Sequence, residues 1–376
     1  MPGFEWINKE ELKAVNKVFK EGGTLIAHGF DKLRKKYYVR DFENYSNKYF
    51  KSKNCLAVSS GTAALKIALK SLGVKTGDEV ITQSFNFIAT VEAILDCGAK
   101  PIITNINNTL NMDPEELPKL ITKKTKAIVP VHMLGVPCEM DKIIYYSKKF
   151  KVPVVEDNCE AVGGKYRDMY LGTIGDLGVF SFDHGKIITS GEGGMILTDN
   201  KKYANYVREF HDHGHQNNKR FPRGKDTRKI YGFNYRMTEL QGAIANTQLK
   251  KLKKIINSNF KRYNILEKNI SPHFKLRKIP QNSKCIYDTF ILIQENKKKR
   301  EKIIKILNKK KFGTKNLPDA MEWHCSYFWD HALTKKQVNR TKKSYKFLKN
   351  CVAIPILKKK SISQYQDLSI SILKYR

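Results

Sequence analysis

A lysine in a stretch of small and polar residues is the first candidate for chemistry in this sequence. Lys186 follows the apolar residues 178–182, and Gly, Ser and Thr continue from it as far as Gly194. A lysine amine can form a Schiff base with an aldehyde once it is partly desolvated and its pKa falls. Since the chain contains 70 Lys and Arg, Lys186 indicates a catalytic site only if other functional groups accompany it.

An acidic residue, Asp157, comes directly after the apolar residues 152–156. The carboxyl ends of parallel strands usually present functional groups, and a buried carboxylate needs a cationic partner. A protonated pyridine nitrogen would be such a partner, because the nearby charge keeps the ring an electron sink. An isolated Asp at this point would more often be a helix cap or half of a surface ion pair.

Residues 58–65, Val-Ser-Ser-Gly-Thr-Ala-Ala-Leu, indicate a strand that passes into a helix. Free N–H groups and the helix dipole favour an anion at such a start, and Gly61 lets a ligand approach the backbone closely. The hydroxyl of Thr62 adds a donor. The segment therefore predicts a phosphate site, although alone it is more often an ordinary capped helix.

The elements that would position these groups follow an alternating pattern. From about residue 54 to residue 200, short runs rich in Val and Ile alternate with helix-like segments, which favours parallel strands joined by crossover helices. A long helix is predicted from residue 239 to about residue 265. Beyond it, a strand at 287–293 and a helix at 300–309 indicate a smaller mixed domain. The predicted strands of the first part are residues 78–81, 127–131, 152–156, 178–182 and 195–198.

Composition limits the class of protein. The chain has 376 residues and a formal net charge of +34, so a nucleic-acid-binding protein is an alternative to an enzyme. The basic residues are scattered, however, and no RNA-recognition, zinc-finger or basic-zipper pattern accompanies them. We therefore expect a solvated basic surface that attracts an anionic substrate, with no nucleic-acid partner.

Other features argue against disulfides, metals and membranes. The seven cysteines are widely spaced without a CxxC pair, which indicates neither a disulfide framework nor a zinc site. His211, His213 and His215 alternate, but a loop near the substrate entrance is a better interpretation than a metal site. No signal-peptide core and no membrane-spanning run is present, so the expected location is cytoplasmic.

The segments around Thr62, Asp157 and Lys186, in this order and spacing, resemble the DegT/DnrJ/StrS sugar aminotransferases of the aspartate-aminotransferase fold, fold type I. The resemblance extends from about residue 42 to residue 248, and more loosely over the whole chain. It implies an α/β fold with a large domain, residues 1–250, in which helices enclose a mostly parallel seven-stranded sheet. A smaller α+β C-terminal domain, residues 251–376, would contact the N-terminal helix.

The same resemblance implies pyridoxal phosphate (PLP) as the cofactor. Gly61, Thr62 and Ser181 would hold its phosphate. The aromatic ring of Phe87 would stack on the cofactor ring, and Asp157 would pair with the pyridine nitrogen.

Three further residues complete the implied site. Lys186 would bind the cofactor covalently and move the proton in catalysis, whereas a related dehydratase group has histidine there. Glu160 stands beside the phenolic oxygen, where many members have Gln. Asn234 would reach the phosphate of a neighbouring subunit, which implies a homodimer with shared active sites.

The implied reaction transfers an amino group, with glutamate as donor, to an aldehyde or keto sugar. Residues 2–5, 211–215 and 232–237 are most similar to transaminases that aminate carbon 8 of a 3-deoxy-octulosonate (Kdo) for lipopolysaccharide. Nucleotide-linked keto-sugars are the other acceptors of the family. A PLP-dependent sugar dehydratase and a non-catalytic PLP-binding regulator stay open as alternatives.

Overall fold

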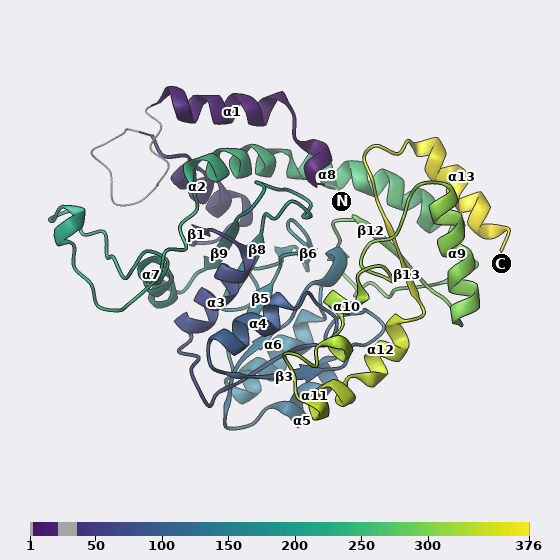
Figure 1. Ribbon diagram of the computed structural model, residues 1–376, viewed down its shortest axis with the longest axis horizontal. Coiled ribbons are helices and arrows are strands. Elements are labelled where there is room, and N and C mark those ends of the chain that lie inside the picture. The colour runs from purple at the N-terminus through teal and green to yellow at the C-terminus, as the bar shows by residue number, and fades with distance from the viewer. Residues whose placement is uncertain (1–2, 22–35, 376) are drawn as a thin grey trace.

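One mixed sheet forms the centre of the computed structural model, which describes residues 3–21 and 36–375. A four-stranded part, β1-β9-β8-β5, and a three-stranded part, β3-β2-β4, are joined by two parallel bridges, Ile128 with Val154 and Val131 with Asp157. The predicted sheet of seven strands, mostly parallel, is thereby confirmed (Figure 1). In spatial order the strands are β1 (Asn54–Val58), β9 (Gly194–Thr198), β8 (Leu177–Ser181), β5 (Val155–Asp157), β4 (Thr125–Val129), β2 (Glu79–Gln83) and β3 (Lys100–Thr104).

Two strands differ from the sequence-based prediction. β9 is antiparallel to both β8 and β1, whereas residues 195–198 were expected among the parallel strands. Residues 182–193, all of them described, contain no helix, and a parallel crossover normally needs one, so the chain returns in the opposite direction. β3 was not predicted, because Lys100 and Pro101 interrupt the apolar pattern; proline is tolerated here since β3 is an edge strand.

Helices cover both faces of the sheet. On one face α3, α4 and α7 pack against alternate strand residues such as Leu56. On the other face α2 and α8 pack against residues such as Cys55, and α5 and α6 cover the β2–β4 end. These helices are α2 (Tyr38–Phe50), α3 (Gly61–Ser71), α4 (Ala89–Asp96), α5 (Leu117–Leu120), α6 (Met140–Phe150), α7 (Lys201–Phe210) and α8 (Glu239–Ile270).

The C-terminal part forms a smaller antiparallel sheet in the order β10-β12-β13. The predicted strand at 287–293 and helix at 300–309 are confirmed as β12 and α9. α8 has 32 residues and runs unbroken through residue 250; the division into residues 1–250 and 251–376 stays a prediction. The elements are β10 (Lys275–Leu276), β12 (Thr289–Ile293), β13 (Cys351–Pro355), α9 (Lys297–Lys309), α10 (Met321–His324), α11 (Lys335–Arg340), α12 (Lys342–Leu348) and α13 (Ile362–Leu373).

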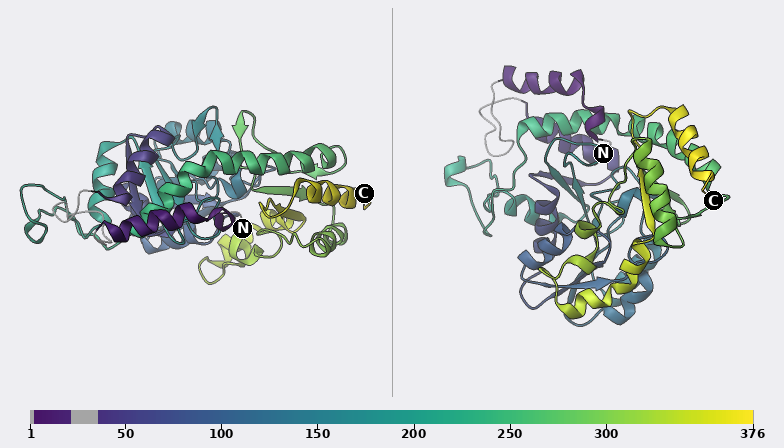
Figure 2. Two further views of the ribbon diagram at one scale, coloured as in Figure 1. Left: turned by 90° about the horizontal axis from the view of Figure 1, so that it is seen from above. Right: turned by 45° about the vertical axis from the view of Figure 1, so that its right-hand side comes forward.

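The N-terminal segment lies along α8. After a short 3-10 helix, η1 (Gly3–Trp6), helix α1 (Lys9–Lys20) contacts α8, and Figure 2 shows the two helices side by side in both views. The remaining short elements are β6 (Lys165–Tyr166), β7 (Met169–Tyr170), β11 (Ser283–Lys284), η2 (Pro114–Glu116), η3 (Met133–Gly135), η4 (Arg223–Lys225) and η5 (Ser326–Phe328).

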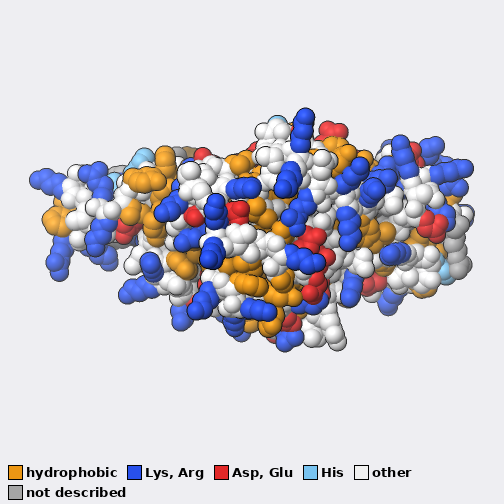
Figure 3. Space-filling view, turned by 90° about the horizontal axis from the view of Figure 1, so that it is seen from below, with side chains coloured by type: hydrophobic (Ala, Val, Ile, Leu, Met, Phe, Trp, Pro, Cys, Tyr) orange, Lys and Arg blue, Asp and Glu red, His pale blue; other side chains and the backbone are white. Residues whose placement is uncertain are grey.

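Basic side chains are spread widely over the surface. Figure 3 shows Lys and Arg distributed along the whole face in view, interspersed with apolar and acidic side chains. Within residues 3–21 and 36–375, no helix is long and apolar enough to cross a membrane.

Candidate active site

A cavity of about 470 Å³ lies where strands β5 and β8 end and helix α3 begins. Functional groups gather at this edge because the carboxyl ends of parallel strands meet there. Seven of the eight predicted site residues line the cavity, and Asn234 does not. The seven are Gly61, Thr62, Phe87, Asp157, Glu160, Ser181 and Lys186.

The start of α3 forms one end of the cavity. Ser60 caps the helix by accepting a hydrogen bond from Ala63 N (3.1 Å), and the N–H groups of the first turn have no partner within the helix. A Cβ atom on Gly61 would lie 2.8 Å from Ser181 Cβ, so only glycine brings the helix start this close to β8. The resulting concave, dipole-positive end can bind a phosphate.

Asp157 occupies the last position of β5 and is 3% exposed. Thr90 Oγ1 donates to its Oδ2 (2.8 Å), and Cys159 N donates to its Oδ1 (3.1 Å). These two donors fix the orientation of a carboxylate that lines the cavity.

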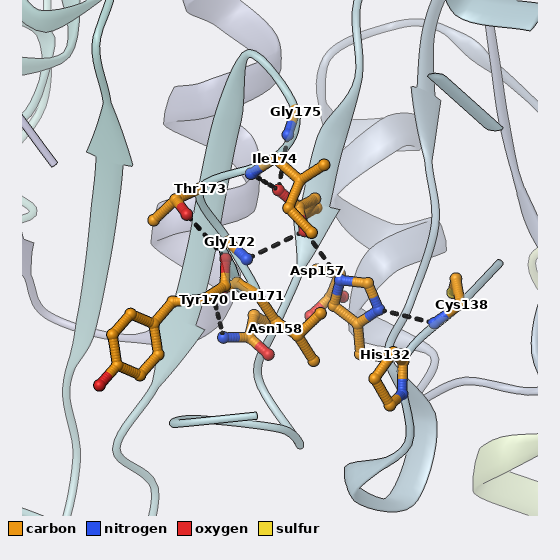
Figure 4. A network of polar contacts seen from close by, with 12 residues as sticks. His132, Cys138, Asp157, Asn158, Tyr170, Leu171, Gly172, Thr173, Ile174 and Gly175 are labelled. Carbon is orange, nitrogen blue, oxygen red and sulfur yellow. Dashed lines mark hydrogen bonds and ion pairs between the residues drawn. The ribbon is translucent and has the colours of Figure 1, made fainter. Parts of the chain in front are cut away.

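A buried polar network holds Glu156, the residue before Asp157 on β5 (Figure 4). Cys138 N donates to His132 Nδ1 (3.1 Å), so the ring proton is on Nε2, which donates to Glu156 Oε2 (3.0 Å). The backbone groups Gly172 N, Ile174 N and Gly175 N also donate to Glu156, at 2.9, 2.6 and 2.6 Å.

We expect Glu156→Gln to lower the free energy of unfolding by about 3 kcal/mol, because an amide has one acceptor oxygen where four buried donors need two. Chemical denaturation measures this change. Glu295→Gln, an exposed carboxylate, is the control and is expected to change the free energy by less than about 0.5 kcal/mol. Equal effects in the two variants would contradict the structural role assigned to Glu156.

Lys186 lies in a tight turn after β8. Asp183 organises this turn by accepting from Gly185 N (2.8 Å) and, through its carbonyl, from Lys186 N (3.0 Å). Lys186 Nζ is 3.8 Å from Glu160 Oε1. Burial lowers the pKa of the Lys186 amine, but the carboxylates of Glu160, Asp157 and Asp183 outweigh burial and raise it. The sequence does not show how many carboxylates surround the amine, so the direction of this shift follows only from the structure.

Glu160 is the closest of these carboxylates. Burial would raise the pKa of its carboxyl, but Lys186, Lys315 and His324 hold that pKa at about 2. Leu134 N donates to Glu160 Oε2 (3.1 Å). A permanently charged carboxylate therefore stands beside the lysine.

Glu160→Gln is expected to lower the pKa of the Lys186 amine, because it removes a negative charge that favours the protonated form. The neutral amine then exists at lower pH. In the cofactor-free variant, the pH midpoint for acylation of Lys186, followed by mass spectrometry of its peptide, should move downward. Glu92→Gln, outside the cavity, should leave the midpoint unchanged; a midpoint that moves upward or stays in place in Glu160→Gln would refute this electrostatic coupling.

Another side of the cavity is lined by Phe87, which follows β2, and by residues of the C-terminal part such as Lys315 and His324. Phe87 is 43% exposed, lies at the cavity, and stacks near Trp323, with ring centroids 6.5 Å apart. His324 Nδ1 bonds to Ala320 O (2.7 Å), and Lys315 Nζ donates to Asp288 Oδ2 (2.6 Å). Lys315 and Thr90 carried no recognisable signal in the sequence.

Asn234 and the three histidines lie on a segment outside the cavity. Asn234 is exposed, and its backbone forms a bridge with Asp212. Two of the histidines have separate partners: His211 Nδ1 bonds to Arg208 O, and His215 Nδ1 bonds to Asp226 Oδ2. In the described part of the chain, no group of three or more His, Cys, Asp or Glu residues could hold a metal ion.

This combination of sheet, helix start, acid and lysine defines a class of protein. Residues 6–368 match the DegT/DnrJ/EryC1/StrS aminotransferase family. The chain belongs to this family.

Relatives and solved structures agree with this assignment. A GDP-perosamine synthase of Caulobacter vibrioides is 41% identical over 218 residues, 57% of each chain. A GDP-perosamine synthase of Escherichia coli O157:H7 is 36% identical over 257 residues, 68% of each chain. The X-ray structure of the aminotransferase from Psychrobacter cryohalolentis superposes with a TM-score of 0.87 at 24% identity, covering 98% of this chain and 97% of that one, which shows the shared fold. This chain thus spans less than two thirds of the length of the Caulobacter relative.

The cofactor is pyridoxal phosphate, and the cavity fits it. Gly61, which leaves no room for a Cβ beside Ser181, provides a cradle for the phosphate at the start of α3. Asp157 provides a fixed carboxylate, and Lys186 provides an amine within the same cavity. These three groups match the phosphate, the pyridine nitrogen and the aldehyde of the cofactor.

Proposed function

We propose that the protein transfers an amino group from glutamate to the carbonyl carbon of a sugar, with Lys186 as the cofactor-binding lysine. The single observation that carries this proposal is the convergence of Lys186, Asp157 and the start of α3 on one cavity. The family assignment supports the reaction class.

Each residue has a defined task in this proposal. The bound cofactor supplies an electron sink and an aldehyde carbon. Asp157 would hold a proton on the pyridine nitrogen, and Phe87 would cover the ring. Lys186 Nζ would move the proton between the donor's α carbon and the cofactor, a task for which the amine must be neutral. The carboxylate of Glu160 favours the protonated form of this amine in the cofactor-free chain.

Two acceptors are consistent with this site. The GDP-perosamine synthases among the relatives favour a nucleotide-linked keto-sugar. The segments at 2–5, 211–215 and 232–237 instead favour 8-oxo-Kdo, an oxidised octulosonate of lipopolysaccharide synthesis. Both substrates are anionic, so the net charge of +34 would attract either one.

The test is a product assay with ¹⁵N-glutamate. Purified holoenzyme should change its visible absorbance on adding glutamate, and mass spectrometry should find ¹⁵N in one sugar of a panel that includes nucleotide-linked keto-sugars and oxidised Kdo. Loss of water from a sugar without incorporation of nitrogen would instead support the dehydratase alternative. If no amino donor changes the visible absorbance of the holoenzyme, the proposed transfer reaction is wrong, and a non-catalytic PLP-binding regulator is the alternative that stays.

We also propose a homodimer in which Asn234 serves the partner's site. Between α7 and α8 the chain forms a loop that extends from the body (Figure 1). Asn234 lies where this loop returns to the body, next to Tyr235, whose carbonyl accepts from Ser59 N (2.8 Å). Asn234 is exposed and does not line the cavity of its own chain. In the proposed dimer, the exposed Asn234 of one subunit contacts the cofactor phosphate bound in the other subunit.

Mixing two inactive variants tests this arrangement. We expect Lys186→Ala and Asn234→Ala each to lose activity, and a refolded mixture to regain about a quarter of the wild-type activity, because half of the dimers are mixed and each has one intact site. Steady-state assays of the mixture and of each variant measure this. A mixture no more active than its components would show that Asn234 does not act across subunits.

A further inference from the structure

The 3-10 helix Gly3–Trp6 packs directly on the loop that carries Lys186. Gly3 is buried, and a Cβ atom at this position would lie 2.0 Å from Lys186 O and 3.2 Å from Lys186 C. The atoms that such a side chain would meet belong to the backbone, so no rotation of a side chain could relieve the contact. Only glycine at position 3 therefore fits against the Lys186 peptide group as it lies in the structure.

Contacts on both sides hold this segment in place. Trp6 is 7% exposed and belongs to the same apolar cluster as Ile187 and Ile188, the residues that follow Lys186. From the C-terminal part, Lys358 N donates to Glu5 Oε2 (2.6 Å), and the Lys358 ammonium lies 4.3 Å from the centre of the Trp6 ring. The segment thus connects the lysine loop to the region after β13.

The following helix is anchored as well. Asn8 and Glu11 form a capping box at the start of α1. Glu11 Oε1 accepts from Gln248 Nε2 (2.8 Å) and from Lys251 Nζ (2.6 Å), both on α8. Burial raises the pKa of the Glu11 carboxyl, but Lys251 and the other donors outweigh burial and lower it, so this anchor stays charged.

We propose that Gly3 is a positioning residue: the turn Gly3–Trp6 fixes the backbone of Lys186 so that its amine stays in the cavity beside Glu160 and Asp157. This inference rests on the proposed role of Lys186. Gly3 itself does not line the cavity. Small displacements of a reacting group have large effects on rate. The buried contact of Gly3 with the Lys186 backbone therefore affects the reactivity of the Lys186 amine by fixing its position.

The test compares two glycine variants. Gly3→Ala places a methyl group against Lys186 O, whereas Gly224→Ala is the matched control because nothing lies within 4 Å of its added Cβ. The readout is the rate at which cofactor-free protein gains visible absorbance on adding PLP. We expect this rate and kcat to fall about tenfold or more in Gly3→Ala, with KM for glutamate within about twofold of wild type, and no change in Gly224→Ala.

A second variant covers the case in which Gly3→Ala does not fold. Glu5→Ala removes the hydrogen bond from Lys358 N to the Glu5 carboxylate without adding atoms. It should slow the absorbance change about threefold while the melting temperature of the holoenzyme stays near that of wild type. Normal rates in folded Gly3→Ala, or in Glu5→Ala when Gly3→Ala is insoluble, overturn the inference. If wild-type protein itself gains no absorbance with PLP, the proposed function fails instead, so the two failures are distinguishable.

Discussion

Replacing Lys186 by alanine is expected to abolish amino transfer, with a fall in kcat of at least about 10³-fold. The variant loses both the amine that binds the cofactor and the base that moves the proton between donor and cofactor. Steady-state assays with glutamate and the acceptor sugar measure the loss. Since Lys186 pairs only loosely with Glu160, at 3.8 Å, the fold should survive the change.

The matched control is Lys254→Ala, which removes an exposed lysine of α8. It should keep wild-type turnover and show that the effect is local rather than a consequence of lower net charge. Turnover of Lys186→Ala within about tenfold of wild type would contradict the mechanism, because no other described lysine lines the cavity except Lys315, whose Nζ is paired with Asp288.

The second large effect is expected for Asp157→Asn, with a fall in kcat of about 10³-fold while the fold is retained. The substitution keeps the size of the side chain and one acceptor oxygen for Thr90 or Cys159. It removes the negative charge that would hold a proton on the pyridine nitrogen. Kinetic assays and thermal unfolding together separate this electrostatic effect from a loss of stability.

Asp96→Asn serves as the control, since this carboxylate is 59% exposed and pairs with Lys66 outside the cavity. Its expected effect on kcat is less than about twofold. Near-normal turnover in Asp157→Asn would mean that the cofactor's ring nitrogen has another partner, and the assignment of Asp157 would have to be withdrawn.

Much of the fold could be predicted because its signal is local. Buried parallel strands are continuous apolar runs, so β4, β5 and β8 were visible in the sequence. The direction of β9 depends on how residues 182–193 return, and edge strand β3 begins with Lys100 and Pro101; neither feature follows from apolar periodicity. Tertiary packing decides both.

The site shows the same division. Lys186, Asp157 and Gly61 were predicted because their chemistry follows from residue type and from position at the end of a strand or the start of a helix. Thr90 was missed, because it is 67 residues from Asp157 and meets it only in the folded chain. The direction of the Lys186 pKa shift could not be predicted either, since burial is one of two opposing effects and the sequence does not show which carboxylates surround the amine.

Reduction of the holoenzyme with borohydride, followed by mass spectrometry of its peptides, tests the central assignment most directly. We predict one phosphopyridoxyl group per chain, on the peptide that contains Lys186, and none on that peptide when glutamate is added before the reductant. A label on another lysine, or no label after incubation with pyridoxal phosphate, would contradict the account.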